Sequence, residues 1–167
     1  YAAGPFLAPL LMLLAVMMIA TAMSALDFDW LYPVRVVATL VIVAWYLPTY
    51  RRLGFLSWRW SWTPFAIGGV VFAIGMLLEP ISGIDGDAAK KQAQALSSIA
   101  PATAALCLTF RAVGSIVTVP IAEELAFRGY LTRRFIADDF EQVPLGAFTW
   151  YSLILSSILF GLLHVRW

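Results

Sequence analysis

The sequence predicts an all-α protein, a multi-pass bundle of transmembrane helices with about five spans. Of its 167 residues, 62% are hydrophobic and 13% are charged, whereas an ordinary soluble domain has roughly 45–50% apolar and about 25% charged residues. Uncharged apolar runs recur along the chain, and a run of about twenty such residues crosses the hydrocarbon core as a helix. The polar residues gather between these runs, as they do in the loops of a membrane protein.

Three of the apolar runs lie in the first half of the chain. Residues 1–26 carry no charge, residues 36–50 form a shorter run, and residues 63–78 form a third. Aromatic rings flank the second and third runs, which is typical of segments that end at a membrane surface. A cleaved signal peptide is the alternative for the first run, but a basic leading segment is missing and the apolar stretch is too long.

The second half contributes the remaining spans. Residues 79–101 form one polar loop, and residues 102–121 are apolar apart from Arg111. We expect a break at Pro120, because proline lacks a backbone N–H and suits the first turn of a new helix. Residues 145–163 give the last run. The organisation predicted is N-terminal membrane helices with a polar loop over 1–100, followed by a core over 101–167.

The charges and the cysteine exclude several classes of function. The net charge is +1, so we expect no nucleic-acid partner and take the lipid bilayer as the chain's surroundings. A single cysteine excludes a disulfide framework or a CxxC zinc site. Basic residues in short loops mark the cytoplasmic side, which places the N-terminus, residues 51–59 and residues 133–141 there.

The sharpest group of charges at membrane depth is EELAFR, residues 123–128. Glu124 and Arg128 are four residues apart, which is a favourable spacing for a charge pair on a helix. Glu123 points about 100° away from Glu124 and has no such partner on its face. A carboxylate in that setting is a candidate general base. The alternative is that both carboxylates favour the positive end of the helix dipole after Pro120.

The last apolar run ends in FGLLH, with Phe160 and His164 four residues apart on one face. Ser157 and Gly161 are small, so we expect another helix to pack closely against that side and to meet the imidazole. A histidine that merely sits at the membrane surface is the alternative. An ionisable residue at the end of a span is nevertheless a functional candidate by default.

Other hydrolytic schemes fit poorly. Ser156 and Ser157 share a helix with His164 and lack a GxSxG turn, so a serine protease is disfavoured. An aspartyl protease needs two aspartates within the membrane, but Asp85 and Asp87 lie in the polar loop. An HExxH zinc protease needs two histidines, and the sequence has one. Water activated by a carboxylate beside a histidine, with or without a metal, is what remains.

These motifs resemble a known family. Residues 123–128 are similar to the EExxxR motif, and residues 160–164 to the FxxxH motif, of the CAAX-protease and bacteriocin-processing enzymes, also called the Abi family of intramembrane endopeptidases. The similarity extends over about 116–167, including the length between the motifs. The sequence of this segment also resembles variants that are associated with exosortase systems.

The resemblance implies a protease that hydrolyses a peptide bond of a membrane-associated protein or peptide, in a multi-pass protein of the bacterial plasma membrane. By this analogy Glu123 activates the attacking water and His164 stabilises the oxyanion. Glu124, Arg128 and Phe160 would support the site. A zinc ion, where one takes part, would be held by Glu123 and His164.

The resemblance also implies a later helix with a further polar motif. The chain stops three residues after His164, so we expect a C-terminally incomplete site and doubtful activity for this piece alone. The main alternative function is a non-catalytic membrane immunity or scaffold protein of the same fold. A transporter is a weaker alternative, because charges are few and no inverted repeat is visible.

Overall fold

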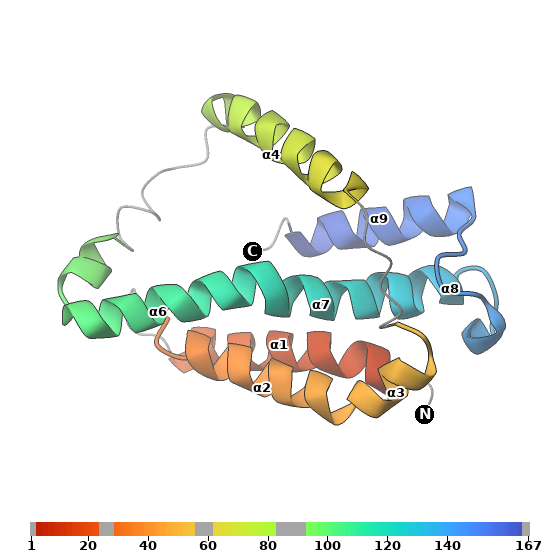
Figure 1. Cartoon of the computed structure of the whole chain (residues 1–167), viewed down its shortest axis with the longest axis horizontal. Helices are drawn as coiled ribbons and strands as arrows, with labels where there is room; N and C mark the ends of the chain where they lie inside the picture. The colour runs from red at the N-terminus through yellow and green to blue at the C-terminus, as the bar shows by residue number, and fades with distance from the viewer. Residues whose placement is uncertain (1–2, 24–28, 56–61, 83–92, 165–167) are drawn as a thin grey trace.

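A computed structural model describes residues 3–23, 29–55, 62–82 and 93–164, and over these ranges the chain is helical and contains no strand. Figure 1 shows most of the helices side by side along one long axis, with the helix of residues 63–82 inclined to it. The elements in chain order are α1 (Gly4–Met23), α2 (Tyr32–Trp45), α3 (Leu47–Arg52), α4 (Thr63–Ser82), α6 (Pro101–Val113), the π-helical η1 (Gly114–Thr118), α7 (Val119–Glu124), the π-helical η2 (Leu125–Leu131), α8 (Thr132–Arg134), the 3₁₀ turn η3 (Phe140–Gln142) and α9 (Trp150–His164).

The fold is a helical membrane bundle, as the apolar runs predict. Two helices are long and apolar enough to cross a membrane, namely Gly4–Met23 and the continuous 34-residue helix Pro101–Arg134. The other apolar runs also form helices, which are shorter: Tyr32–Trp45, Phe65–Leu77 and Trp150–Leu163. All five predicted apolar segments are therefore helical in the residues that the structure describes.

The expected break at Pro120 is wrong, because the helix passes through this residue. The reason lies in the preceding π-helical turn, η1, where the N–H of Val119 donates to the carbonyl of Gly114, five residues earlier. A π-helical turn bonds a carbonyl to the N–H five residues later instead of four, which relaxes the demand for a donor at Pro120, where the N–H is missing. The wider turn thus accommodates the proline without ending the helix.

A second proline, Pro9, lies inside α1, and a different helix compensates for it. An α-helical carbonyl accepts from the N–H four residues later, so Pro9 leaves the carbonyl of Pro5 without its donor. The hydroxyl of Tyr50, on α3, donates a hydrogen bond to that carbonyl oxygen. This bond ties α3 to the first turn of α1.

A buried hydrophobic cluster lies at the end of the bundle where α1 begins. There Phe6, Tyr50, Leu125 and Phe140 form a buried group, called here the Phe6 cluster. Gly129 of η2 allows this packing, since a Cβ at that position would lie 2.7 Å from Cδ1 of Phe6. Side chains from α1, α3, η2 and η3 therefore meet at one end of the molecule.

Helix ends differ slightly from the predicted runs. The second run ends as a helix at Trp45, and the chain restarts as α3 with Pro48 in its first turn. The last helix begins at Trp150, not at 145. Residues 144–149 form a turn that includes Gly146 at φ 84, a backbone conformation that favours glycine.

The N-terminal end of α1, α3 and α8 lie at the same end of the bundle (Figure 1). This brings together Arg51 and Arg52 of α3 with Arg133 and Arg134 of α8. The described parts of the segments predicted to face the cytoplasm thus share one end, and residues 1–2 and 56–59 lie outside the described residues. The side of the membrane to which that end belongs stays a prediction.

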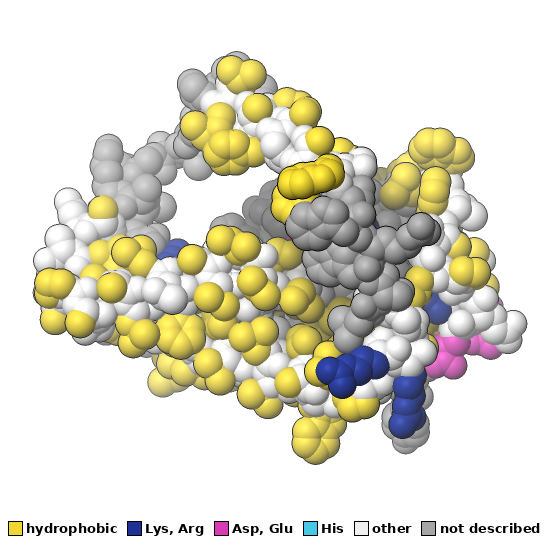
Figure 2. All heavy atoms as spheres, viewed as in Figure 1, with side chains coloured by type: hydrophobic (Ala, Val, Ile, Leu, Met, Phe, Trp, Pro, Cys, Tyr) yellow, Lys and Arg dark blue, Asp and Glu magenta, His cyan; other side chains and the backbone are white. Residues whose placement is uncertain are grey.

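Helix α4, unlike the Phe6 cluster, is exposed along its length in the side chains that the structure describes. The side chains described between Phe65 and Leu77 are all exposed, and so is most of the outward face of α9. Figure 2 shows hydrophobic side chains over both helices. Such apolar surfaces suit contact with lipid, which agrees with a membrane bundle.

Candidate active site

Glu124, the last residue of α7, and Arg128, in η2, form the charge pair that their spacing predicts. The Nε atom of Arg128 lies 3.3 Å from Oε2 of Glu124. Both side chains are open, with 80% of the arginine and 55% of the glutamate exposed. The pair therefore sits on an accessible face of the long helix and is not locked into the packed core.

Glu123 precedes this pair and is half-buried. It has a polar interaction of its own, so the expected contrast, in which Glu124 alone has a partner, does not hold. The two adjacent carboxylates still differ in their surroundings, because one is half-buried and the other is exposed. That difference in burial remains a physical basis for different roles.

Helix α9 packs antiparallel to the stretch that carries these charges. Later residues of α9 contact earlier residues of the long helix. Three pairs define the register: the Phe135 and Tyr151 rings with centroids 6.4 Å apart, the Thr132 and Ser156 hydroxyls with oxygens 3.3 Å apart, and the Phe127 and Phe160 rings with centroids 5.1 Å apart.

This register fixes where the predicted histidine lies along the bundle. His164 is the last residue of α9 and follows Phe160 by one helical turn, and Glu123 precedes Phe127 by one turn of the long helix. Because the two helices are antiparallel, the backbone at 164 lies level with the backbone at 123. The structure thus brings the two predicted motifs to the same height of the bundle.

Phe160 packs against the long helix, but the small residues expected beside it do not. A Cβ on Gly161 would meet nothing within 4 Å, and Ser157 is exposed. The buried small residues are Ser152 and Ser156. Small side chains let helices approach each other closely. In α9 the small residues at the helix contact are Ser152 and Ser156, which lie one turn apart.

The start of α9 is capped by reciprocal hydrogen bonds. The N–H of Thr149 donates to Oγ of Ser152 at 2.9 Å, and the N–H of Ser152 donates to Oγ1 of Thr149 at 3.1 Å. Such caps satisfy backbone donors that a helix start leaves open. The cap, the hydroxyl pair and the ring pairs together set the position of α9.

Comparison with known proteins adds a family to this geometry. Residues 103–167 match the family model described as type II CAAX prenyl endopeptidase Rce1-like. This segment is Rce1-like. The resemblance to the CAAX-protease family is thereby confirmed for the part of the chain that holds both motifs. No curated protein and no solved structure matches the chain.

The Rce1-like segment contains a buried arginine whose structural role the sequence did not reveal. Arg133, predicted as a basic residue of a cytoplasmic loop, is only 4% exposed. Its guanidinium donates to the carbonyls of Val143 at 2.8 Å, Gly129 at 3.0 Å and Glu141 at 3.3 Å. Arg133 therefore fastens the turn that leads towards α9.

Aromatic rings complete the surroundings of Arg133. Its guanidinium carbon lies 5.2 Å from the centre of the Phe140 ring and 5.9 Å from that of Phe6, distances at which a cation is attracted to an aromatic face. Nothing in the sequence separates Arg133 from its exposed neighbour Arg134, because the partners come from distant turns.

The donors described in the Rce1-like segment do not make up a zinc site. A catalytic zinc ion takes three protein ligands, and among the described residues no group of three or more His, Cys, Asp and Glu could hold a metal. Glu124 is already paired with Arg128, which leaves Glu123 and, by its place in the register, His164.

Proposed function

We propose that this protein is an intramembrane endopeptidase that hydrolyses a peptide bond of a membrane-associated protein or peptide, in a bacterial plasma membrane. The Rce1-like match supports a protease-like function. The observation that carries the proposal is the register of α9, which brings position 164 level with Glu123 through the Phe127–Phe160 ring contact. A carboxylate and an imidazole at one height of a membrane bundle can divide the work of hydrolysis.

In the proposed reaction Glu123 accepts a proton from water as the water oxygen attacks the carbonyl carbon of the scissile bond. His164 stabilises the negative charge that develops on the carbonyl oxygen. The tetrahedral intermediate then collapses, the C–N bond breaks, and the proton held by Glu123 passes to the leaving nitrogen. Glu124 and Arg128 keep the helix segment oriented through their charge pair, and Phe160 holds α9 against Phe127.

The test is cleavage of a candidate membrane-associated substrate by the native full-length protein and its variants. Glu123→Gln should lower the rate about 10²- to 10⁴-fold, because it removes the general base. His164→Ala should lower it about 10²- to 10³-fold, because it removes oxyanion stabilisation. Glu141→Gln is the matched control, since Glu141 is an exposed glutamate of η3 and should leave the rate unchanged.

The same experiment separates the protease from a non-catalytic immunity or scaffold protein of this fold. If Glu123→Gln and His164→Ala both cleave at the wild-type rate while remaining folded, the proposed mechanism is wrong. Failure of the wild-type protein to cleave any membrane peptide, with its partner binding intact in both variants, would favour the scaffold function instead.

Zinc bound by Glu123 and His164 stays a prediction with its own test. If zinc takes part, a chelator should abolish cleavage and added zinc should restore it. Full activity after metal removal, verified by metal analysis of the purified protein, would show that water activation relies on the side chains alone.

A further inference from the structure

A second group of charged side chains lies at the end of the bundle away from α3 and α8. It consists of Asp29, Tyr32, Arg35 and Arg111 and is called here the Tyr32 cluster. The guanidinium carbon of Arg35 lies 5.0 Å, and that of Arg111 5.1 Å, from the centre of the Tyr32 ring. The proposed hydrolysis uses none of these residues, although Arg111 is a charge in an otherwise apolar run.

The ring at the centre of this cluster is held in place by the long helix. A Cβ on Gly114 would lie 2.7 Å from Cε1 and 2.9 Å from Cζ of Tyr32. Only glycine at this position lets the ring come so close to η1. The ring is therefore fixed between α2 and the long helix, and it sets the positions of both arginines.

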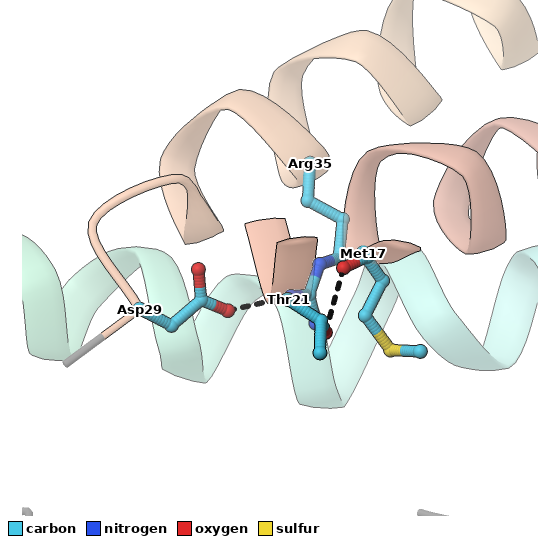
Figure 3. A network of polar contacts seen from close by, with 4 residues as sticks. All are labelled: Met17, Thr21, Asp29 and Arg35. Carbon is cyan, nitrogen blue, oxygen red and sulfur yellow. Dashed lines mark hydrogen bonds and ion pairs between the residues drawn. The ribbon is translucent and has the colours of Figure 1, made fainter. Parts of the chain in front are cut away.

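The cluster carries more positive than negative charge. Arg35 reaches from α2 to Asp29, with Nη2 2.5 Å from Oδ2 (Figure 3). Arg111 adds a second guanidinium, which cannot be more than about 10 Å from the first, because both lie about 5 Å from one ring centre.

Protein groups do not satisfy every polar atom of the cluster. Oδ1 of Asp29 and Nε of Arg35 are buried and make no hydrogen bond. Buried polar atoms of this kind usually have a partner, and an unpaired one calls for an explanation such as a water or a bound ion. The excess charge and the unused Nε of Arg35 point to an anionic partner, whereas Oδ1 of Asp29 calls for a donor such as water.

The depth of the cluster identifies the anion. Helix α1 has 20 residues, so it is about 30 Å long, which is the thickness of the hydrocarbon core. Asp29 and Tyr32 pack beside the end of the bundle where α1 finishes, at the level where lipid headgroups begin. Trp30 beside them is 47% exposed, and tryptophan is enriched at that level of a membrane protein.

We infer that the Tyr32 cluster binds the phosphate of a phospholipid headgroup, with Arg111 and Arg35 as the cations that face it. Planar guanidinium groups match the geometry of phosphate oxygens. The acyl chains would lie along the exposed apolar side chains that continue from the cluster on α2, such as Val34 and Val37, which are 51% and 49% exposed.

The test is native mass spectrometry of the full-length protein after delipidation, with three separate additions. These are phosphatidylglycerol, diacylglycerol with the same acyl chains, and inorganic phosphate. We expect retention of phosphatidylglycerol and loss of diacylglycerol, which lacks the phosphate. Equal retention of the two lipids would overturn the inference, and tight binding of inorganic phosphate alone would overturn the assignment to lipid. This comparison uses the wild-type protein and needs no variant.

Two variants locate the site. Arg111→Gln should weaken phosphatidylglycerol retention about fivefold, the effect of one basic residue near a lipid phosphate, and Arg111→Lys should weaken it less because it keeps the charge. Arg52→Gln, an exposed arginine at the opposite end of the bundle, is the matched control and should retain lipid like the wild type. Unchanged retention in a folded Arg111→Gln protein would place the lipid elsewhere.

Discussion

Arg128 and Arg133 lie five residues apart in one membrane helix, yet they have opposite surroundings. Arg133 is 4% exposed and donates to three backbone carbonyls. Arg128 is 80% exposed and faces Glu124 at 3.3 Å. The difference shows that the elements packed around a charge, and not the charge itself, decide its use. Arg133 holds the fold together, whereas Arg128 lies on an exposed face of the helix.

The largest expected effect is on stability, at Arg133. Replacement by alanine removes the donors of three carbonyls and a cation from two aromatic rings, so we expect a loss of about 3 kcal/mol in the free energy of unfolding. Arg134→Ala is the control, because Arg134 pairs with the fully exposed Asp138, and it should cost less than about 0.5 kcal/mol. Unfolding by SDS in detergent micelles measures both, and equal losses would contradict the comparison.

The next effect concerns the hydroxyl of Tyr50, in the same packed region. Tyr50→Phe leaves the carbonyl of Pro5 without a donor, which should cost about 1–2 kcal/mol at neutral pH. Burial, with a smaller contribution from Tyr46, raises the pKa of Tyr50 to about 12, whereas an unfolded tyrosine titrates near pH 10.

The sign of the resulting pH dependence follows from this raised pKa. The folded state favours the neutral phenol, so the contribution of Tyr50 is fully present below about pH 10 and is lost as the pH rises to about 12. The stability difference between wild type and Tyr50→Phe should therefore shrink between these values. A difference that stays constant over this range would argue against a buried phenol.

Arg128 should show the reverse pattern, with a larger effect on activity than on folding. If the proposed protease activity holds, Arg128→Gln should lower kcat about tenfold, because Glu124 loses the partner that orients it. Its unfolding free energy should change by less than about 0.5 kcal/mol, as is typical of an exposed pair. A stability loss as large as that of Arg133→Ala would remove the distinction between the two arginines.

The smallest effect tests how α9 is held beside the open face. Ser156→Ala removes the acceptor of the Thr132 hydroxyl, and we expect a loss of about 0.5 kcal/mol. Ser157→Ala, on the exposed side of the same helix, should be neutral. Thermal unfolding compares the two variants. A larger loss of stability for Ser157→Ala than for Ser156→Ala would contradict the packing described.

The sequence predicts much of this fold because each span has its own signal. Uninterrupted apolar runs gave the five apolar helices, and the four-residue spacing predicted the Glu124–Arg128 pair. The passage through Pro120 was not predictable from proline chemistry alone, since it depends on a π-helical register that starts six residues earlier. Local rules therefore located the helices but misjudged where one of them ends.

The candidate site was predictable in its residues more than in its packing. Glu123, Glu124 and Arg128 follow from spacing, and the heights of the two motifs agree. The face of α9 that is buried, and the burial of Arg133, depend on contacts with residues ten or more positions away. A pattern of small residues could not choose between Ser156 and Ser157, because both faces of α9 present serines.

The bond from Tyr50 to Pro5 also bears on the order in which the protein is made. When helix α1 leaves the ribosome, the carbonyl of Pro5 has no donor in the helix, because Pro9 lacks an N–H. Its donor, Tyr50, lies 45 residues later in the chain. At about 5–20 residues per second, that donor follows after about 2–9 s. For this interval the carbonyl of Pro5 has no donor from its own helix, and only the later synthesis of α3 supplies one.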